Sequence, residues 1–290
     1  MKSGFVSVVG RPNVGKSSLV NELVGSKVAI TSPRPQTTRM AIRGVLHDPD
    51  AQIVFTDTPG LHRPRTALGS RLNRIVYGSL EDGDGVLFVI DASKGIGPGD
   101  QGIAKRLMGG SPWVVVAVNK TDRATPAAIG EALAEASEWG FDAYVPTSAR
   151  TGDQLTSLRD ELVARLAEGP EFFPRGTVTD QPEQLVVAEI VREKFLSRLR
   201  DELPHSLTVQ ITDFSERKGG ELYVAADLVV ERRSQKGMVV GKGGELLRDA
   251  GTEARKELEK MLGRKVYLDL RAKVEKDWQR SEDMLDRLGF

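Results

Sequence analysis

The chain has 290 residues, of which 39% are apolar and 28% charged, and this composition is typical of an ordinary globular protein with room for two domains. Its 41 basic and 41 acidic residues cancel, which excludes an overall positive field, so nucleic acid or anionic lipid would have to bind a local patch. There is no cysteine, which excludes disulfides and thiolate metal sites and is compatible with a cytoplasmic location.

Short Val-rich runs alternate with helical patterns through residues 1–168. This alternation is typical of a parallel sheet covered by helices on both faces, so we expect an α/β domain. The expected strands are Phe5–Val9, Ile53–Thr56, Gly85–Ile90, Trp113–Val118 and Tyr144–Pro146, and the expected helices are 17–24, 67–80, 100–108, 126–138 and 153–167. A sixth strand, Ala41–His47, follows a polar stretch, and we expect it to pair antiparallel at an edge.

Residues 169–183 are rich in Gly and Pro, which predicts a linker to a second domain at 184–290. There, apolar residues recur every four positions from Val187 to Leu203, which predicts a helix that ends at Pro204. Alternating patterns predict a hairpin of strands around 207–211 and 222–230. The further expectations are a helix at Gln235–Val240, a helix to about Leu262, a strand from Val266 to Leu270, and a final helix that carries Val274, Trp278, Leu285 and Leu288.

The run Gly10-Arg11-Pro12-Asn13-Val14-Gly15-Lys16-Ser17 lies between a predicted strand and a predicted helix and matches the phosphate-binding pattern G-x-x-x-x-G-K-[ST]. The glycines let backbone N–H groups approach an anion at the positive end of a helix. We expect Lys16 to reach the β- and γ-phosphates and the Ser17 hydroxyl to ligate Mg²⁺. The predicted nucleotide-binding residues here are Gly10, Asn13, Val14, Gly15, Lys16, Ser17 and Ser18.

Asp57-Thr58-Pro59-Gly60 follows a predicted strand about forty residues after the phosphate loop. We expect Asp57 to hold the magnesium shell through water and the Gly60 N–H to contact the γ-phosphate. The polar segment Pro33–Arg39 is predicted to supply a hydroxyl that completes the shell, with Thr38 preferred and Thr37 as the alternative. The predicted metal ligands are therefore Ser17, Thr38 and Asp57.

Two further motifs follow successive predicted strands, Asn119-Lys120-Thr121-Asp122 and Thr147-Ser148-Ala149. One carboxylate can accept both the N1–H and the 2-amino group of guanine, and adenine lacks this paired edge, so Asp122 predicts selection of GTP. We expect Asn119 to bond the base edge and brace the phosphate loop, the Lys120 stem to lie across the purine, and the Ala149 N–H, beside Ser148, to reach O6.

The position after Gly60, where many related switches carry a Gln that orients water, is Leu61, which has no polar group. Slow intrinsic turnover is therefore expected, and His62 fits a surface role as well as a catalytic one. We interpret Asn13 as a candidate ligand of K⁺ beside the phosphates, with a role in stabilising the loop as the alternative. The predicted catalytic residues are Lys16, Thr38, Gly60 and Asn13.

Gly241-Lys242-Gly243-Gly244 lies between two predicted helices after the hairpin and matches the G-x-x-G loop with which KH domains clamp about four nucleotides. Alone, the pattern also fits a helix C-cap, but the element order α-β-β-α-α-β favours RNA. Residues 231–248 hold five basic and two acidic residues, so the positive charge is local. The predicted RNA-binding residues are Arg232, Arg233, Lys236, Gly241, Lys242, Gly243, Gly244 and Arg248.

In these motifs the chain resembles the Era family, bacterial Ras-like GTPases of the TrmE-Era type with a carboxy-terminal KH domain. The resemblance covers essentially all 290 residues. Besides the motifs above, it is carried by Pro35-Gln36-Thr37-Thr38-Arg39, by His62, by the segments 189–194 and 203–206, and by Gln235-Lys236-Gly237.

The resemblance implies a mixed, mostly parallel six-stranded GTPase domain followed by a type II KH domain. It implies GTP, GDP and Mg²⁺ as ligands, 16S rRNA near its 3′ end and the 30S subunit as partners, and a peripheral contact with the inner membrane. We therefore expect a GTP-hydrolysing switch that acts in small-subunit maturation, as a monomer. The alternative is a GTPase whose second domain binds protein or the membrane surface rather than RNA.

Overall fold

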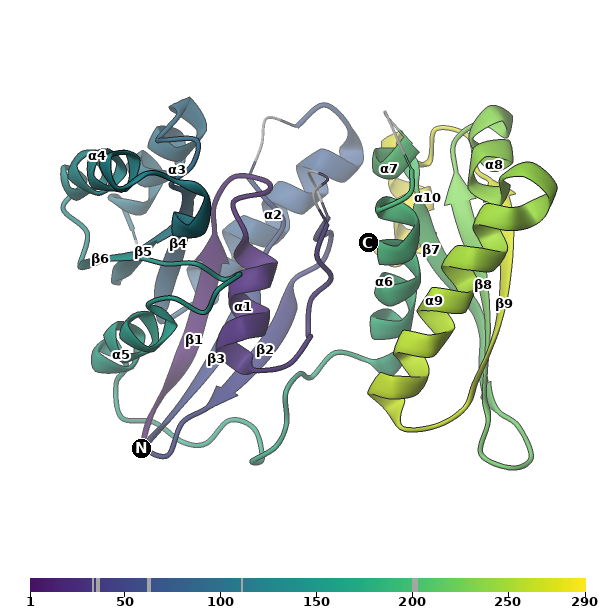
Figure 1. Cartoon of the computed structure of the whole chain (residues 1–290), viewed down its shortest axis with the longest axis horizontal. Helices are drawn as coiled ribbons and strands as arrows, with labels where there is room; N and C mark the ends of the chain where they lie inside the picture. The colour runs from purple at the N-terminus through teal and green to yellow at the C-terminus, as the bar shows by residue number, and fades with distance from the viewer. Residues whose placement is uncertain (33, 35–36, 62–63, 111, 200–202) are drawn as a thin grey trace. The chain divides into compact units, whose positions relative to one another are not determined.

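The computed structural model describes residues 1–290 except 33, 35–36, 62–63, 111 and 200–202 (Figure 1). The chain divides into two compact units. The first is formed mainly by residues up to Asp180, and the second by Gln181–Phe290 with short pieces at Ser32–Arg34 and Thr66–Leu68. No helix among the described residues is long and apolar enough to span a bilayer.

The first unit is built on a six-stranded sheet in the order β2-β3-β1-β4-β5-β6. Its strands are β1 (Lys2–Val9), β2 (Ile42–His47), β3 (Ala51–Asp57), β4 (Gly85–Asp91), β5 (Val114–Asn119) and β6 (Ala143–Pro146). All neighbours are parallel except β2, which pairs antiparallel with β3 at the edge. The α/β fold with an antiparallel edge strand is thus confirmed.

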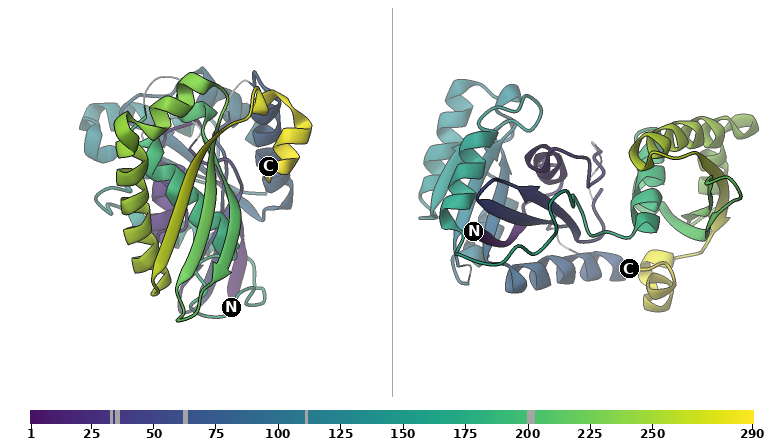
Figure 2. Two further views of the ribbon diagram at one scale, coloured as in Figure 1. Left: turned by 90° about the vertical axis from the view of Figure 1, so that its right-hand side faces the viewer. Right: turned by 90° about the horizontal axis from the view of Figure 1, so that it is seen from below.

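Helices cover both faces of this sheet, because the inner strands are apolar on both sides. The helices are α1 (Lys16–Val24), α2 (Ala67–Asp82), α3 (Pro98–Leu107), α4 (Pro126–Ser137) and α5 (Leu155–Arg165). One buried cluster joins Leu19 of α1 and Leu158 of α5 to the sheet, and the other joins Val76 of α2 and Ile103 of α3 to the opposite face. The view from below in Figure 2 shows α1 and α2 on opposite sides of the strands. The polar motifs lie at the carboxyl ends of β1, β3, β5 and β6, so the fold gathers them at one edge of the sheet.

The segment predicted as a linker packs against the first unit as far as residue 180. The fully buried amide of Gln52 on β3 accepts the N–H groups of Phe172 and Phe173 at 2.8 and 3.0 Å and donates to the Phe173 carbonyl at 2.7 Å. Further along, the Val45 N–H of β2 donates to the Val178 carbonyl at 2.9 Å. The Gly and Pro content of residues 169–183 predicted a linker but could not reveal this anchoring. The anchoring depends on the side chain of Gln52, which is distant in the sequence.

The second unit is a three-stranded sheet with two long helices on one face (Figure 1). Its elements are α6 (Glu183–Leu196), α7 (Leu203–Ser206), β7 (Thr208–Glu216), β8 (Leu222–Val230), α8 (Arg233–Val240), η2 (Lys242–Gly244), α9 (Glu245–Leu262), β9 (Val266–Val274), η3 (Trp278–Arg280) and α10 (Glu282–Arg287). Strand β7 pairs antiparallel with β8, and β8 pairs parallel with β9. The alternating residues Leu222, Val224 and Ala226 are buried beneath the helices. The predicted order α-β-β-α-α-β is confirmed.

Two predicted helices of this unit were wrong in extent. The helix expected to run to Pro204 ends at Leu196, where the side chains of Ser197 and Arg198 bond the Lys194 carbonyl at 3.1 and 2.9 Å and satisfy the helix end. Pro204 instead lies in the first turn of the short helix α7. Backbone N–H groups in a first turn have no partner within the helix, so a proline, which lacks this group, is tolerated there.

The expected final helix is broken into three pieces. Val274 ends strand β9, Trp278 begins η3, and only Glu282–Arg287 forms a helix, α10. The break lies at Asp277, whose φ of 53° is left-handed and does not continue a helix, and α10 restarts at Ser281, whose hydroxyl accepts the Met284 N–H at 3.3 Å.

Candidate functional site

The phosphate loop joins β1 to α1, as predicted, and two of its glycines are fixed by close contacts. Gly15 has a left-handed φ of 103°, and a Cβ on it would lie 2.3 Å from Asn119 Nδ2. Gly10 passes so near β4 that a Cβ would lie 2.4 Å from the Val89 carbonyl. Both positions thus exclude a side chain, and the loop can present its N–H groups to an anion at the start of α1.

Lys16 lies inside this loop and is 6% exposed. Its Nζ donates to the carbonyls of Gly10 and Arg11, each at 3.2 Å. Burial lowers the pKa of Lys16 to about 8, against an opposing effect of the nearby Asp57 carboxylate. Bound phosphates would place additional negative charge next to this ammonium and so favour its charged form.

The three predicted magnesium ligands come together. Ser17 Oγ lies 2.9 Å from Thr38 Oγ1 and donates to Asp57 Oδ2 at 2.6 Å, and Thr38 Oγ1 donates to the same oxygen at 3.2 Å. Asp57 is fully buried, and no hydrogen-bond partner for its Oδ1 is found among the described residues. Burial raises the pKa of Asp57, although Lys16, Ser17 and Thr38 oppose the effect. A buried carboxylate that keeps one oxygen without a hydrogen-bond partner, beside two hydroxyls, fits a small hard cation. One of the two hydroxyls belongs to Thr38, the threonine that the sequence analysis preferred.

The turn after Asp57 approaches the phosphate loop. A Cβ on Gly60 would lie 2.6 Å from the Pro12 nitrogen, and the Leu61 N–H donates to the Gly10 carbonyl at 3.3 Å. Gly60 is thus placed beside the loop, where its N–H can meet a γ-phosphate. His62 and the segment residues Pro33, Pro35 and Gln36 lie outside the described residues.

Asn119, at the end of β5, holds two loops together. It is 1% exposed, its Nδ2 donates to the Val14 carbonyl at 2.9 Å, and its Oδ1 accepts the Ala149 N–H at 3.1 Å. The bracing role predicted for Asn119 therefore appears in the structure. The Ala149 N–H, predicted to reach guanine O6, is directed to Asn119 here, and Ser18 lies in the first turn of α1.

Asp122 is oriented by the loop after β6. Its Oδ1 accepts the Ser148 hydroxyl at 2.6 Å, and its Oδ2 lies 2.6 Å from Nη2 of Arg150, whose side chain is 71% exposed. The Ser148 bond, and then the Arg150 charge, lower the pKa of Asp122. The carboxylate therefore stays ionised at neutral pH and can accept the two guanine donors once Arg150 moves aside.

Lys120 has a partner that the sequence analysis missed. Its Nζ contacts the Asn13 carbonyl and lies 2.7 Å from Asp91 Oδ2, at the carboxyl end of β4. Burial alone would raise the pKa of Asp91, but the bonds from Lys120 and Ser93 outweigh it, and the net shift is downward. With Nζ fixed at both sides, the Lys120 stem is held beside Gly15, as a purine platform requires.

In the second unit, the Gly241–Gly244 loop joins α8 to α9, as predicted. Gly241, Gly243 and Gly244 all have left-handed φ values, from 60° to 79°, and the Lys242 side chain between them is exposed. The other predicted RNA-binding cations are exposed as well, namely Arg232, Arg233, Lys236 and Arg248. The loop and these cations are therefore all accessible to a ligand.

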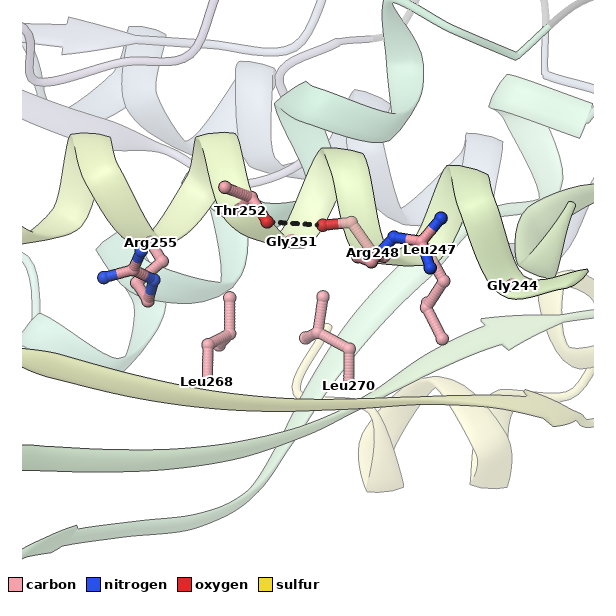
Figure 3. A pocket seen from close by; sticks show the side chains of 8 residues that line it. All are labelled: Gly244, Leu247, Arg248, Gly251, Thr252, Arg255, Leu268 and Leu270. Atoms are coloured by element: carbon pink, nitrogen blue, oxygen red, sulfur yellow. Dashed lines mark hydrogen bonds between the residues drawn. The ribbon is translucent and has the colours of Figure 1, made fainter.

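A groove of about 320 Å³ begins at this loop and runs between α9 and β9 (Figure 3). Its lining residues are Gly244, Leu247, Arg248, Gly251, Thr252, Arg255, Leu268 and Leu270. Figure 3 shows Leu268 and Leu270 directed from the strand toward the helix, with Arg248 and Arg255 along its length. Gly251 widens the groove, because a Cβ there would lie 3.2 Å from Leu270 Cδ1. Of the predicted RNA-binding residues, only Gly244 and Arg248 line it.

Known proteins with similar sequences match both units. A family model described as 50S ribosome-binding GTPase matches residues 5–120, and one described as KH domain matches residues 202–279. GTPase Era of Mycobacterium tuberculosis (strain ATCC 25618 / H37Rv) is 52% identical over 295 residues, with 99% of this chain and 98% of the relative covered. The chain belongs to the Era family of GTPases. It is therefore a GTPase with a carboxy-terminal KH domain.

Two solved Era structures agree with this chain over its length. A variant of Aquifex aeolicus Era bound to GDP.AlF4- is 38% identical with a TM-score of 0.95, covering 100% of this chain and 99% of that chain. Era in complex with MgGDPNP and nucleotides 1506–1542 of 16S ribosomal RNA is 40% identical with a TM-score of 0.94 and the same coverage. The fold expected from the Era-family resemblance is confirmed.

Within this Era-family chain, sequence reasoning missed the partners that lie outside the motifs. Asp91 and Arg150 contact motif residues, and neither belongs to a recognised run. The sequence does contain a signal for the groove. Gly251 lies inside a strongly amphipathic helical pattern where no turn is expected, and such a glycine indicates that another group approaches the helix closely.

Proposed function

We propose that this chain is a GTP-controlled RNA-binding protein that binds 16S rRNA near its 3′ end and acts in assembly and maturation of the 30S subunit. The observation that carries the proposal is the Gly241–Gly244 loop with the adjoining groove, in a chain similar throughout to an Era protein solved with such an RNA. The nucleotide acts as a timer for that binding.

The nucleotide part of the proposal follows from the geometry of the first unit. Backbone N–H groups of the phosphate loop cradle the phosphates, and Lys16 leaves the carbonyls of Gly10 and Arg11 to bond phosphate oxygens. Ser17, Thr38 and Asp57 are the residues that would hold Mg²⁺, which neutralises charge between the β- and γ-phosphates when it is bound. Asp122 selects guanine.

Leu61 cannot orient water, so hydrolysis relies on backbone groups and on the phosphate loop. Asn13 has a left-handed φ of 64°, a conformation that asparagine tolerates better than most residues. We include K⁺ at Asn13 in the proposal, because an amide oxygen beside the phosphates can ligate a monovalent cation there. The cation would supply the positive charge that an arginine supplies in other switches.

Turnover in K⁺ and in Na⁺ tests this part. The wild-type rate should rise in K⁺, and the response should disappear in Asn13→Gly, which removes the amide and keeps the left-handed backbone unstrained. Equal rates in the two salts, or an unchanged K⁺ response in the variant, would refute it.

The RNA part uses the shape and charge of the second unit. The glycines of the loop leave its backbone bare, so a phosphate can approach it at the N-terminal end of α9. The apolar floor of Leu247, Leu268 and Leu270 suits stacked bases, and Arg248 and Arg255 supply positive charge along one side.

Titration of the full chain with an RNA of the sequence of nucleotides 1506–1542 tests this part, with a GTP analogue bound throughout. Lys242→Asp should weaken binding at least about tenfold and leave GTP hydrolysis unchanged, since it places a like charge against phosphate. Lys218→Asp, the same change in the exposed β7–β8 turn, is the matched control and should leave affinity within about twofold. Absence of wild-type binding, with capture of a protein or of anionic vesicles instead, would establish the alternative.

We propose a GTPase domain at 1–168, a connecting segment at 169–183 and a KH domain at 184–290, in a cytoplasmic monomer with peripheral membrane contact. Light scattering should give one chain per particle. Vesicle flotation should recover a fraction of the protein with the vesicles. Complete absence of the protein from the vesicles would refute the proposed membrane contact.

A further inference from the structure

Arg11, the second residue of the phosphate loop, directs its side chain toward the first turn of α3. Its Nε donates to Asp100 Oδ1 at 2.8 Å, and its Nη2 lies 2.7 Å from Asp100 Oδ2. The pairing is therefore bidentate, which fixes orientation as well as distance. Asp100 is completely buried, and its Oδ2 also accepts the Gly97 N–H at 2.9 Å.

The start of α3 and the residues just before it are shaped to admit this arginine. A Cβ on Gly99 would lie 2.7 Å from Arg11 Cδ, and a Cβ on Gly97 would lie 3.3 Å from Arg11 Nη1. Arg11 Nη2 also donates to the Gly95 carbonyl at 3.3 Å. Two glycines, a carbonyl and a buried carboxylate thus form a slot, residues 95–100, that the guanidinium fills.

The backbone of the same residue faces the site of the reaction. The Arg11 carbonyl is one of the two acceptors of Lys16 Nζ, and its neighbours Gly10 and Pro12 are the residues that meet Leu61 and Gly60. Arg11 therefore lies at the middle of the surface against which the Gly60 turn must close on a γ-phosphate. Movement of this carbonyl would change both contacts together.

Stability alone does not account for the pair. Removing a carboxylate from water costs free energy, and the attraction within a buried ion pair often does no more than offset that cost. A protein with an apolar pair of similar volume in the same place is commonly as stable. Burial in fact raises the pKa of Asp100, against the opposing effects of Gly97 and Arg11. What the pair adds beyond stability is a fixed orientation for one half of the phosphate loop.

The geometry points to Arg11 and Asp100 as positioning residues for GTP hydrolysis, which hold the Gly10–Pro12 half of the loop in register with the Gly60 turn. They act on the hydrolytic step and leave the binding of GDP unchanged, because GDP has no γ-phosphate on which that turn closes. The inference rests on the GTPase activity of the family and is independent of RNA binding.

Single-turnover phosphate release at saturating GTP, alongside GDP affinity, tests the inference. Arg11→Lys keeps the charge but loses the two-pronged geometry, and Asp100→Asn keeps the shape but loses the charge. Each should slow hydrolysis about 10- to 100-fold, with GDP affinity within about threefold. The double variant should be no slower than the slower single variant, since the two residues act as one unit.

Arg165→Lys is the matched control, because Arg165 pairs with Glu161 on α5 by a salt bridge of 2.5 Å outside the phosphate loop. Its hydrolysis rate should stay within twofold of the wild type. An unchanged rate in Arg11→Lys, an equal loss of rate and GDP affinity, or additive losses in the double variant would overturn the inference. If Asp100→Asn fails to fold, Arg11→Lys alone decides, because it leaves no buried carboxylate without a cation.

Discussion

The nucleotide site and the RNA loop differ in how far their residues are committed to the fold. In the first, Asp57 and Asn119 are at most 1% exposed, and Asn119 bonds other loops of the site through both ends of its amide. In the second, Lys242 and Arg248 are exposed, and only the glycines carry a structural requirement. Changes in the first site should therefore affect folding and binding together, whereas changes to the exposed cations of the second should affect binding alone.

The largest expected effect is that of Asp122→Asn on nucleotide choice. The amide cannot accept both guanine donors, so GTP affinity should fall roughly 10²- to 10³-fold through loss of two charge-assisted hydrogen bonds. Xanthine carries a carbonyl where guanine carries the 2-amino group, so the variant should bind the xanthine nucleotide better than GTP. Calorimetric titration with both nucleotides measures this.

A control for that prediction is Asp153→Asn, an exposed carboxylate close to the same loop. It should leave GTP affinity within about twofold. Retention of wild-type GTP affinity by the Asp122 variant would contradict the assignment of the base site.

A pair of glycine substitutions compares the two sites directly. Gly15→Ala adds a Cβ that would lie 2.3 Å from Asn119 Nδ2 at a φ of 103°, so it should cost about 3 kcal/mol of unfolding free energy. Gly243→Ala adds a Cβ that meets nothing within 4 Å at a φ of 60°, and should cost only about 1 kcal/mol.

Urea titrations of both variants provide the measurement. Equal losses of stability would contradict the distinction between a site built into the fold and a site built on its surface. A larger loss for Gly243→Ala would reverse it.

A smaller effect is expected from pH. In the free protein the pKa of Lys16 is lowered to about 8, and bound phosphates would raise it again, so GTP binding above pH 8 takes up a proton. Affinity should therefore fall as pH rises above 8, by up to about tenfold per pH unit. Calorimetry in two buffers of different ionisation enthalpy reports the proton directly, and an affinity that stays flat from pH 7 to 9.5 would show that Lys16 is charged throughout.

The same difference explains how much could be predicted from sequence. The phosphate loop and the guanine motifs are contiguous runs whose chemistry depends on their own backbone, so the sequence predicted correctly which strands and helices they join. Asp91 contacts Lys120 because β4 lies beside β5 in the sheet, and Asp100 contacts Arg11 because β4 also lies beside β1. Such pairings follow from strand order rather than from local pattern. The groove depends likewise on the packing of α9 against β9.

The errors in the second unit have local causes. Leu268, Leu270, Ala272 and Val274 continue a period of two along β9, but Val274 also stands four residues before Trp278, which resembles a helical spacing. The left-handed backbone at Asp277 ends the strand pattern and prevents a continuous helix, and the residue type alone does not predict this conformation. The anchoring of residues 172–173 depends in the same way on one distant side chain, Gln52.

The most direct test of the account is the affinity of the full chain for the RNA of nucleotides 1506–1542, measured with a non-hydrolysable GTP analogue and with GDP. The account predicts tighter binding with the GTP analogue, by about 5- to 150-fold, the usual range of coupling between two sites. Equal affinity in the two nucleotide states would contradict it, because the nucleotide would then control nothing at the RNA loop.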